Sequence, residues 1–260
     1  MRIMTSNIWG NYFGNPPEER ADGLIKTYEK YLPDIIGFQE VKDDWYETKL
    51  FKKLSKKYRF AGTEFLYSSN DMHSPIAYKN QFKLIASGFE YLKTDWEDPS
   101  KAITWVVLNQ PNSDKYFAVC NTHFWWPKGE RHDLIREDNA NQMVSLAKSL
   151  HAKFSCPVFI IGDMNTTIKS TVFDVYERNG IINLYNVAKS KKDVSSDHGD
   201  PIRDEKGVLR GKTTANGHAF SLDHILSLNS PYKVERHVVV VDQEALDSTD
   251  HSPVFVDIDM

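Results

Sequence analysis

The stretch from Val158 to Asn165 constrains the fold more than any other part of the chain. It begins with four apolar residues in a row, Val158 to Ile161, which Pro157 precedes and Gly162 follows. A short apolar run between Pro and Gly is typical of a strand that is buried on both faces. The run therefore predicts a central strand in a covered α/β sheet.

Two polar residues, Asp163 and Asn165, follow this strand at a spacing of two. In extended chain, alternate side chains point the same way, so both can face one spot. The carboxyl ends of strands in open α/β sheets are also where ligands bind. Asp and Asn are ordinary turn formers, however, so these two residues by themselves fit a simple turn equally well.

Polar residues at other predicted strand ends favour a site over a turn. These positions carry amide, carboxylate and imidazole groups, namely Asn7, Glu40, His123, Asp163, Asn165, Asp223, Asp250 and His251. Such groups bind a hard divalent cation through oxygen, activate water and stabilise a charged transition state. The sequence has no Cys/His cluster with zinc spacing, Gly-rich phosphate loop or Gly-x-Ser-x-Gly elbow. It thus favours metal-assisted attack by water over nucleophilic catalysis by Ser or Cys.

Hydrophobic periodicity predicts an alternation of strands and helices. Besides the central strand, we expect strands at 2–9, 34–41, 74–79, 82–92, 102–109, 116–124, 221–226, 234–241 and 253–258. Helices are expected at 15–32, 43–58, 133–153 and 170–180. Residues 190–212 are polar and predict a long surface loop rather than a linker. The expectation is a single domain that spans residues 1–260.

Composition limits the class of protein and its partners. With 40% hydrophobic and 26% charged residues, the chain resembles an ordinary globular protein. Its net charge of −4 does not attract polyanions over the whole surface, so a nucleic-acid site would need a local basic patch. The 2 Cys form no disulfide framework. The sequence shows neither a secretory signal nor an apolar run of transmembrane length, which predicts a cytoplasmic protein.

Several blocks of the chain resemble, in order, those of the endonuclease/exonuclease/phosphatase superfamily, the deoxyribonuclease I-like proteins. The blocks are Asn7 after the first strand, Ile36–Val41, Asn121–His123, Ile161–Asn165, Leu222–Ile225 and Thr249–Val254. Each block is a weak signal, but together they span nearly the whole chain. The resemblance implies a four-layer α/β sandwich, in which two mostly antiparallel sheets face each other and helices lie outside. It also implies a Mg²⁺-dependent phosphoric ester hydrolase.

The resemblance assigns roles in binding the cation and the attacking water. Glu40 is implied as the main ligand of a Mg²⁺ or Mn²⁺ ion. Asn7 and Asp250 would lie beside that ion or contact it through water. Asp163 would align and deprotonate the attacking water, and Asn165 would hold that water or a phosphate oxygen.

Two histidines complete the implied catalytic set. His251, with its ring oriented by Asp223, would stabilise the pentavalent transition state or take part in proton transfer. His123 would donate to a phosphate oxygen or to the leaving group. The choice between His123 and His251 as proton donor stays open, as does the choice between one and two metal ions.

Residues next to these blocks fit more than one role. Trp125 and Arg131 are our candidates for contacting the substrate, although core packing and solvated loop charge explain them as well. His224 should point to the opposite face from Asp223 and be structural. The other histidines match no family position, and we expect them on the surface or the rim of the site: His73, His132, His151, His198, His218 and His237.

The sequence leaves three functions open, because one superfamily fold serves DNA, phospholipids and phosphorylated sugars. The first is a phosphodiesterase or phosphatase on a compact phosphate derived from a lipid or sugar, which the acidic net charge favours. The second is a DNA or RNA endonuclease or exonuclease. The third is a non-catalytic binding protein, which is the weakest because each catalytic position is filled. No obligate protein partner is implied.

Overall fold

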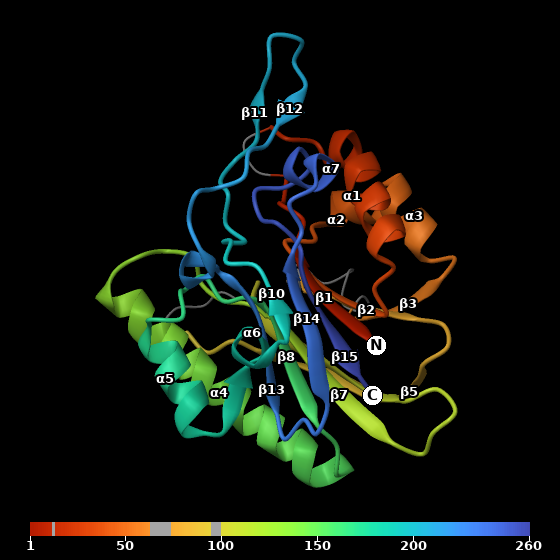
Figure 1. Ribbon diagram of the computed structural model, residues 1–260, viewed down its shortest axis with the longest axis vertical. Helices are drawn as coiled ribbons and strands as arrows, with labels where there is room; N and C mark the ends of the chain where they lie inside the picture. The colour runs from red at the N-terminus through yellow and green to blue at the C-terminus, as the bar shows by residue number, and fades with distance from the viewer. Residues whose placement is uncertain (12–13, 63–73, 95–99) are drawn as a thin grey trace.

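A computed structural model describes residues 1–11, 14–62, 74–94 and 100–260 of the protein (Figure 1). One sheet contains, in order across it, β10 (Ser190–Lys191), β14 (Lys233–Val239), β15 (Val254–Asp259), β1 (Arg2–Asn7), β2 (Ile35–Gln39), β4 (Ile76–Lys79) and β3 (Tyr58–Ala61). The other contains β5 (Lys83–Tyr91), β6 (Ala102–Asn109), β7 (Tyr116–His123), β8 (Val158–Asp163), β13 (Asp223–Leu228) and β9 (Ile181–Asn183). Among these neighbours, only β1–β2, β10–β14 and β7–β8 run parallel. The expected pair of mostly antiparallel sheets is confirmed.

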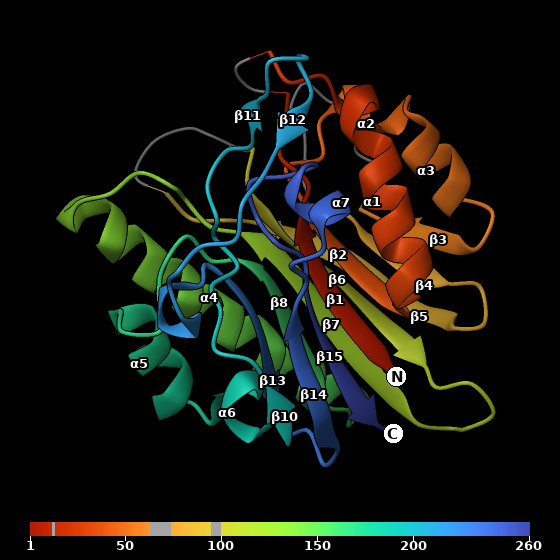
Figure 2. The same ribbon diagram turned by 45° about the horizontal axis from the view of Figure 1, so that its top comes forward.

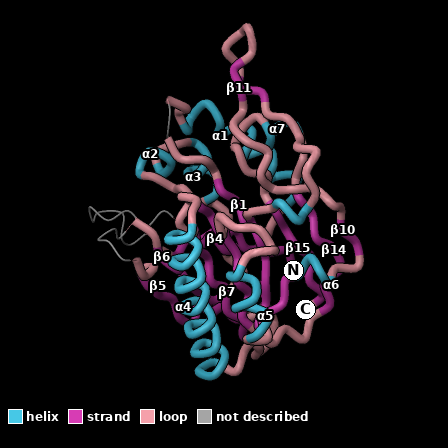
Figure 3. The backbone as a smooth tube through the Cα atoms, turned by 90° about the vertical axis from the view of Figure 1, so that its left-hand side faces the viewer, coloured by secondary structure: helices cyan, strands magenta, loops and turns pink. Residues whose placement is uncertain are grey.

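Helices cover the outer faces of the two sheets (Figure 2). The first sheet is covered by α1 (Pro17–Tyr31), α2 (Asp43–Tyr46), α3 (Lys49–Leu54) and α7 (Gln243–Leu246). The second is covered by α4 (Glu130–Phe154) and α5 (Thr171–Arg178), which lie in front of the strands in Figure 3. Shorter elements are α6 (Leu184–Val187), the 3₁₀ turn η1 (His218–Phe220) and the hairpin β11 (Ile202–Arg203) and β12 (Leu209–Arg210). The predicted four-layer sandwich is therefore correct.

The central strand β8 shows why its sequence is apolar throughout. Phe159 and Ile161 belong to the core between the two sheets. Val158 and Ile160 belong to the core under α4 and α5. Because side chains alternate along a strand and both faces of this one are covered, every position requires an apolar residue. Beside β8 lie two buried thiols, Cys120 in β7 and Cys156 just before the strand.

The two sheets pack closely where β2 faces β7 and β8. A Cβ atom added to Gly37 would lie 2.5 Å from both Asn121 Oδ1 and Ile161 Cδ1. Asn121 bridges the sheets, because its amide donates to the carbonyl of Phe38 at 2.8 Å and its oxygen accepts from Gln39 at 2.7 Å. A buried polar group needs such partners, so this amide network fixes how the sheets dock.

Two expected elements were wrong in detail. The helix expected at 43–58 is two short helices, α2 and α3, because the Thr48 hydroxyl donates to the Trp45 carbonyl at 2.6 Å and closes the first turn. The chain then enters β3, which periodicity did not predict. The loop expected at 190–212 contains β10, β11 and β12, and Ser195 and Ser196 within it are buried.

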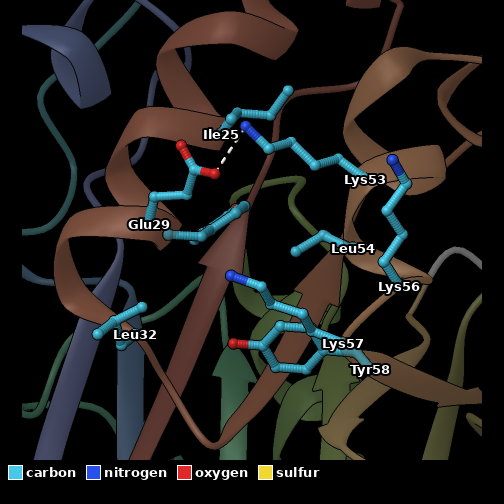
Figure 4. A pocket seen from close by; sticks show the side chains of 9 residues that line it. Ile25, Glu29, Leu32, Lys53, Leu54, Lys56, Lys57 and Tyr58 are labelled. Atoms are coloured by element: carbon cyan, nitrogen blue, oxygen red, sulfur yellow. Dashed lines mark ion pairs between the residues drawn. The ribbon is translucent and has the colours of Figure 1, made fainter.

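A small cavity of about 130 Å³ lies in the outer helix layer, between α1 and α3 (Figure 4). Ile25, Leu54 and Tyr58 line it, and Glu29 and Lys53 form an ion pair at 2.6 Å across it. None of the predicted site residues lines this cavity. None of the helices in the described part of the chain is long and apolar enough to cross a membrane.

Candidate active site

Strand order brings the predicted residues to one edge of the molecule. In the first sheet, parallel pairing places Asn7 opposite Gln39, so Asn7 lies next to Glu40. In the second sheet, His123 and Asp223 both pair with Asp163, from the two sides of β8. Since β1–β2 and β7–β8 end at the same edge, residues from six separate sequence blocks meet there.

Glu40 and Asp163 are joined by the amide of Asn7. Asn7 Nδ2 donates to Glu40 Oε1 at 2.9 Å and to Asp163 Oδ2 at 3.1 Å. The other oxygen of Glu40 accepts from the Gly10 N–H at 2.7 Å. Asn7 Oδ1 accepts from the Trp9 N–H at 2.9 Å, so the side-chain oxygen of Asn7 faces its own loop. Asn7 therefore presents its NH₂ group, and not its oxygen, to the two carboxylates.

His251 lies between two buried aspartates. Its Nδ1 is 2.8 Å from Asp223 Oδ2 and 3.8 Å from Asp163 Oδ2. On the other side of Asp163, His123 Nε2 lies 3.5 Å from the same Oδ2 and 4.0 Å from Glu40 Oε1. The hydrogen bond from Nδ1 to Asp223 orients the His251 ring and leaves its opposite ring nitrogen for other partners.

The turn after β8 fixes Asn165 beside Asp163. The Asn165 N–H donates to Asp163 Oδ1 at 2.8 Å, and its side-chain amide donates to the Phe124 carbonyl at 2.9 Å. Asn165 thus forms the turn and also lies in the site. Its side-chain amide has a second N–H and an oxygen that these hydrogen bonds do not use.

Three residues that line the site have strained backbones. Trp9, Glu40 and Asn165 have φ angles of 57°, 61° and 48°, in the left-handed region that non-Gly residues rarely adopt. Such strain costs about 1–3 kcal/mol per residue and persists where the surroundings impose it, typically at functional sites. Arg20 supplies part of that support, because its buried guanidinium donates to the carbonyls of Ile8 and Trp9 at 2.7 and 2.6 Å.

The buried carboxylates perturb one another. Burial, with the charge of Asp223 added, raises the pKa of Asp163, and His251 opposes the shift. Burial, with Glu40 and Asp200 added, likewise raises the pKa of Asp250. Burial disfavours the charged ring of His251, but Asp223, Asp163 and Asp250 outweigh it and raise its pKa well above the ordinary value. The site therefore has an excess of negative charge that favours cations.

Two groups of side chains have the spacing of a metal site. Glu40, His123 and Asp163 form one, and Asp163, Asp223 and His251 the other, with ligand atoms within 4.8 Å of one another in each. Carboxylate oxygens dominate, which suits a hard divalent cation, and the negative charge calls for one. The residues present therefore fit a metal ion of the kind expected. Asp223 is already engaged with His251, so the group around Glu40 fits better.

A cavity of about 530 Å³ opens at this edge. Among the described residues, its lining includes most of the predicted ones, namely Glu40, His123, Trp125, Asp163, Asn165, Asp250 and His251. Asn7 and Asp223 lie behind it, in contact with lining residues. Arg131 is exposed on the first turn of α4 and is not among the described lining residues.

Sequence reasoning missed other lining residues, namely Trp9, Ser74, Ser100, Lys101 and Asp200. Trp9 closely follows Asn7, so proximity in sequence was an available signal. Trp126, next to the candidate Trp125, also lines the cavity. Lys101 precedes β6, and Asp200 lies in the polar segment 190–212. Nothing in the sequence distinguishes these two residues from ordinary solvated charges.

Two histidines expected at the surface or rim are buried. His218 and His237 are only 2% and 1% exposed and pack with His224, on the side of β13 away from the cavity. The expectation was wrong because η1 brings His218 between His224 of β13 and His237 of β14, which local sequence does not reveal. His224 is buried against Phe173, as a structural residue would be. His73 lies outside the described residues.

The fold and this constellation define a class of phosphoester-cleaving proteins, and residues 4–251 match the model of the Endonuclease/Exonuclease/phosphatase family. The chain belongs to that family. Most of its members are phosphoesterases or nucleases, and they depend on divalent metal ions. A comparison with curated protein sequences gave no match.

Solved structures share the fold at low sequence identity. An endonuclease/exonuclease/phosphatase family protein from Bacteroides thetaiotaomicron has a TM-score of 0.78 at 18% identity, with 99% of this chain and 97% of that one covered. The mannosyl-6-phosphatase Bt3783 from B. thetaiotaomicron VPI-5482 has a TM-score of 0.74 at 18% identity, with both chains covered completely at 100%. The human Nocturnin catalytic domain with bound sulfate has a TM-score of 0.73 at 17% identity, covering 100% and 94%.

Proposed function

We propose that this protein is a Mg²⁺- or Mn²⁺-dependent hydrolase that cleaves a compact phosphoester by in-line attack of water. The observation that carries the proposal is the convergence of Glu40, Asp163 and the His251–Asp223 pair around one cavity. Family membership supports the reaction class. A bound divalent cation would neutralise charge that develops on the phosphoryl oxygens.

Glu40 is the main candidate to hold the cation. Its two oxygens are oriented by Asn7 Nδ2 and the Gly10 N–H, and its strained backbone places it at the cavity wall. Because Asn7 turns its NH₂ group towards Glu40 and Asp163, we assign Asn7 the task of orienting these carboxylates. Asp250, which also lines the cavity, is a second candidate ligand, direct or through water.

We assign Asp163 the task of aligning the attacking water and accepting its proton. Burial raises its pKa, which makes it a better base than an exposed aspartate. Asn165 lies beside it to hold the water or a phosphate oxygen. Charged His251, held by Asp223, would stabilise the negative transition state, and His123 would donate to a phosphate oxygen or the leaving group.

Cavity size and charge support a compact substrate. A cavity of about 530 Å³ lies within the usual range for small-molecule sites, about 300–1,000 Å³. A non-specific nuclease instead needs an extended basic surface that contacts many phosphates. Among the described lining residues, Lys101 is the one Lys or Arg. The likeness in fold to the mannosyl-6-phosphatase Bt3783 adds support for a phosphomonoester of a sugar.

Turnover of a phosphoester panel with Mg²⁺, Mn²⁺ or chelator tests the proposal. The panel contains sugar monophosphates, p-nitrophenyl phosphate, bis-p-nitrophenyl phosphate, phospholipid vesicles and plasmid DNA. We expect hydrolysis of small esters that chelator abolishes, and weak or no cleavage of plasmid. Efficient nicking of plasmid at physiological salt would reverse the ranking in favour of the nuclease. Absence of turnover on every ester would favour the third function, a non-catalytic binding protein.

The Glu40→Gln variant tests the metal assignment directly. It keeps the size of the side chain but removes the charge, so calorimetry should show much weaker Mg²⁺ binding and activity should drop severely. Glu47→Gln, on the loop between α2 and α3, removes the same charge outside the cavity and is the matched control. Unchanged Mg²⁺ affinity in Glu40→Gln would remove Glu40 as the principal ligand.

A further inference from the structure

Asp200 is a carboxylate in the active-site cavity that the proposed chemistry does not use. It comes from the segment between β10 and β11, and not from a strand end. It lies within electrostatic reach of the site, because its charge adds to burial and Glu40 in raising the pKa of Asp250. The metal and water roles have other candidates, so Asp200 is a cavity-lining carboxylate without an assigned role in the reaction.

The segment that carries Asp200 is tied to the catalytic strands. The Ser196 hydroxyl accepts from the N–H groups of Leu222 and Asp223, both at 3.2 Å, and the Ser196 carbonyl accepts from the Ser252 N–H at 2.8 Å. Two residues before Asp200, the His198 N–H donates to the Asp250 carbonyl at 3.3 Å. These bonds hold the segment that carries Asp200 against the segment that carries Asp250 and His251.

Other walls of the cavity are aromatic and cationic. Trp126 is 71% exposed although it lines the cavity, and Trp125 beside it is buried. Lys101 Nζ lies 5.6 Å from the centre of the Trp125 ring and donates to the Phe124 carbonyl at 3.2 Å. The cavity thus combines an open aromatic face, a cation and, at Asp200, a carboxylate that accepts hydrogen bonds.

We propose that Asp200 is a specificity-determining residue that accepts hydrogen bonds from hydroxyl groups of the leaving group, so that the cavity selects phosphomonoesters of sugars or polyols. This inference rests on the proposed phosphoester hydrolase function. A sugar offers several O–H donors to a carboxylate and C–H faces to Trp126. An acyl chain offers no donor, and an oligonucleotide brings further phosphates towards a carboxylate that repels them.

Substitution of Asp200 should change substrate preference more than general activity. We compare wild type, Asp200→Ala and Asp200→Asn on mannose 6-phosphate, glucose 6-phosphate and p-nitrophenyl phosphate, whose leaving group carries no aliphatic hydroxyl. The ratio of kcat/KM for the best sugar phosphate to that for p-nitrophenyl phosphate should fall about 10- to 100-fold in Asp200→Ala, the scale of hydrogen bonds to a charged group. The fall should be expressed mainly in KM.

Asp200→Asn and an oligonucleotide separate hydrogen bonding from charge. The neutral amide still accepts hydrogen bonds, so the ratio should fall less than in Asp200→Ala. Cleavage of a single-stranded oligonucleotide should increase in both variants, because the repelling charge is gone. Glu205→Gln, in the exposed β11–β12 turn and outside the described cavity lining, removes the same charge and should leave the ratio unchanged.

Several results would overturn the inference. Equal losses on sugar phosphates and p-nitrophenyl phosphate would mean that Asp200 acts on the cation or the general structure. A wild type that hydrolyses p-nitrophenyl phosphate but no sugar phosphate would refute the role of Asp200 and leave the proposed function standing. Hydrolysis of none of these esters would overturn both.

Discussion

At the scale of single residues, the site consists of polar groups whose partners lie in distant parts of the sequence. His251 depends on Asp223, 28 positions before it, and Glu40 depends on Asn7, 33 positions before it. Each of these bonds fixes an orientation, which matters because misplaced catalytic groups lose much of their effect. The strained φ angles of Trp9, Glu40 and Asn165 also show that the backbone is held in place for the side chains.

Removal of the His251 ring should lower kcat more than removal of the charge that orients it. We expect His251→Ala to reduce kcat by about 10²- to 10⁴-fold, the scale of a positioned acid–base group, and Asp223→Asn to show a milder defect. The two effects should not add in the double variant, because both act through one ring. His132→Ala, on α4 and outside the described cavity lining, is the control. Near-normal kcat in folded His251→Ala would defeat this assignment.

Residue types and order predicted much of the candidate site. The predicted residues meet as expected, because Glu40 directly follows β2, and His123 and Asp163 end β7 and β8. His251 lies beside them in the same cavity. The sequence did not indicate Lys101 or Asp200, because their place in the cavity depends on how loops close over the sheet ends. Nor did it indicate which group of the Asn7 amide would face Glu40, since both orientations satisfy the same motif.

At the scale of elements, the face of β13 away from the cavity holds a buried histidine cluster. The ring of His218, on η1, stacks on Tyr185 with 3.6 Å between centroids and lies 5.2 Å from the ring of His237, on β14. Asp193 accepts from the His218 N–H at 2.7 Å, and Lys191 on β10 adds positive charge nearby. The ring nitrogens of His237 are buried and have no hydrogen-bond partner among the described residues.

This cluster should make the protein less stable in acid. Burial, with His224 and Lys191 added, lowers the pKa of His218 to about 2 and of His237 to about 3. In the unfolded chain both histidines bind protons as the pH falls through about 6.5, whereas in the folded chain they stay neutral. The stability that depends on the neutral rings is therefore fully present above about pH 6.5 and is lost as the pH falls below it. Each histidine should contribute about 1.4 kcal/mol of loss per pH unit, down to its folded pKa.

Urea denaturation at pH 7.5 and pH 5 measures this effect. In His237→Phe, which keeps an aromatic ring without a titrating group, the difference in unfolding free energy between the two pH values should shrink by about 2 kcal/mol relative to wild type. The same difference in variant and wild type would show that His237 is not neutral in the fold.

At the scale of the whole molecule, each sheet supplies about half of the site, at the ends of β1–β2 in one sheet and of β7–β8 in the other. Hydrophobic periodicity predicted most of the strands and helices, because strands covered on both faces need continuous apolar runs. Their arrangement in two facing sheets was implied by the family resemblance and not by periodicity. Periodicity did not predict β3 or the break between α2 and α3, where tertiary packing and the Thr48–Trp45 hydrogen bond override it. How closely the sheets approach depends on Gly37, whose role appears only when Asn121 and Ile161 lie opposite it.

Gly37→Ala should separate the sheets or distort their contact. The added methyl would lie 2.5 Å from Asn121 Oδ1 and Ile161 Cδ1, and overpacking of this kind typically costs about 1–3 kcal/mol. Chemical denaturation should show that loss, and kcat should fall because Glu40 moves relative to Asp163. Ser87→Ala, at an exposed position of β5, should change stability by less than about 0.5 kcal/mol. Wild-type stability in Gly37→Ala would mean that the two sheets have room for a methyl group at this point.

The burial of Cys120 and Cys156 has a practical consequence for labelling. The chain has 2 Cys, and burial raises the pKa of Cys156 to about 11 and that of Cys120 further. Both thiols are therefore protonated and shielded at neutral pH, and maleimides react with exposed thiolates. A cysteine introduced at exposed Glu205 would be the preferred attachment point for a fluorophore on the β11–β12 turn. The native chain thus serves, without removal of its own cysteines, as a background for site-specific spectroscopy of the segment that carries Asp200.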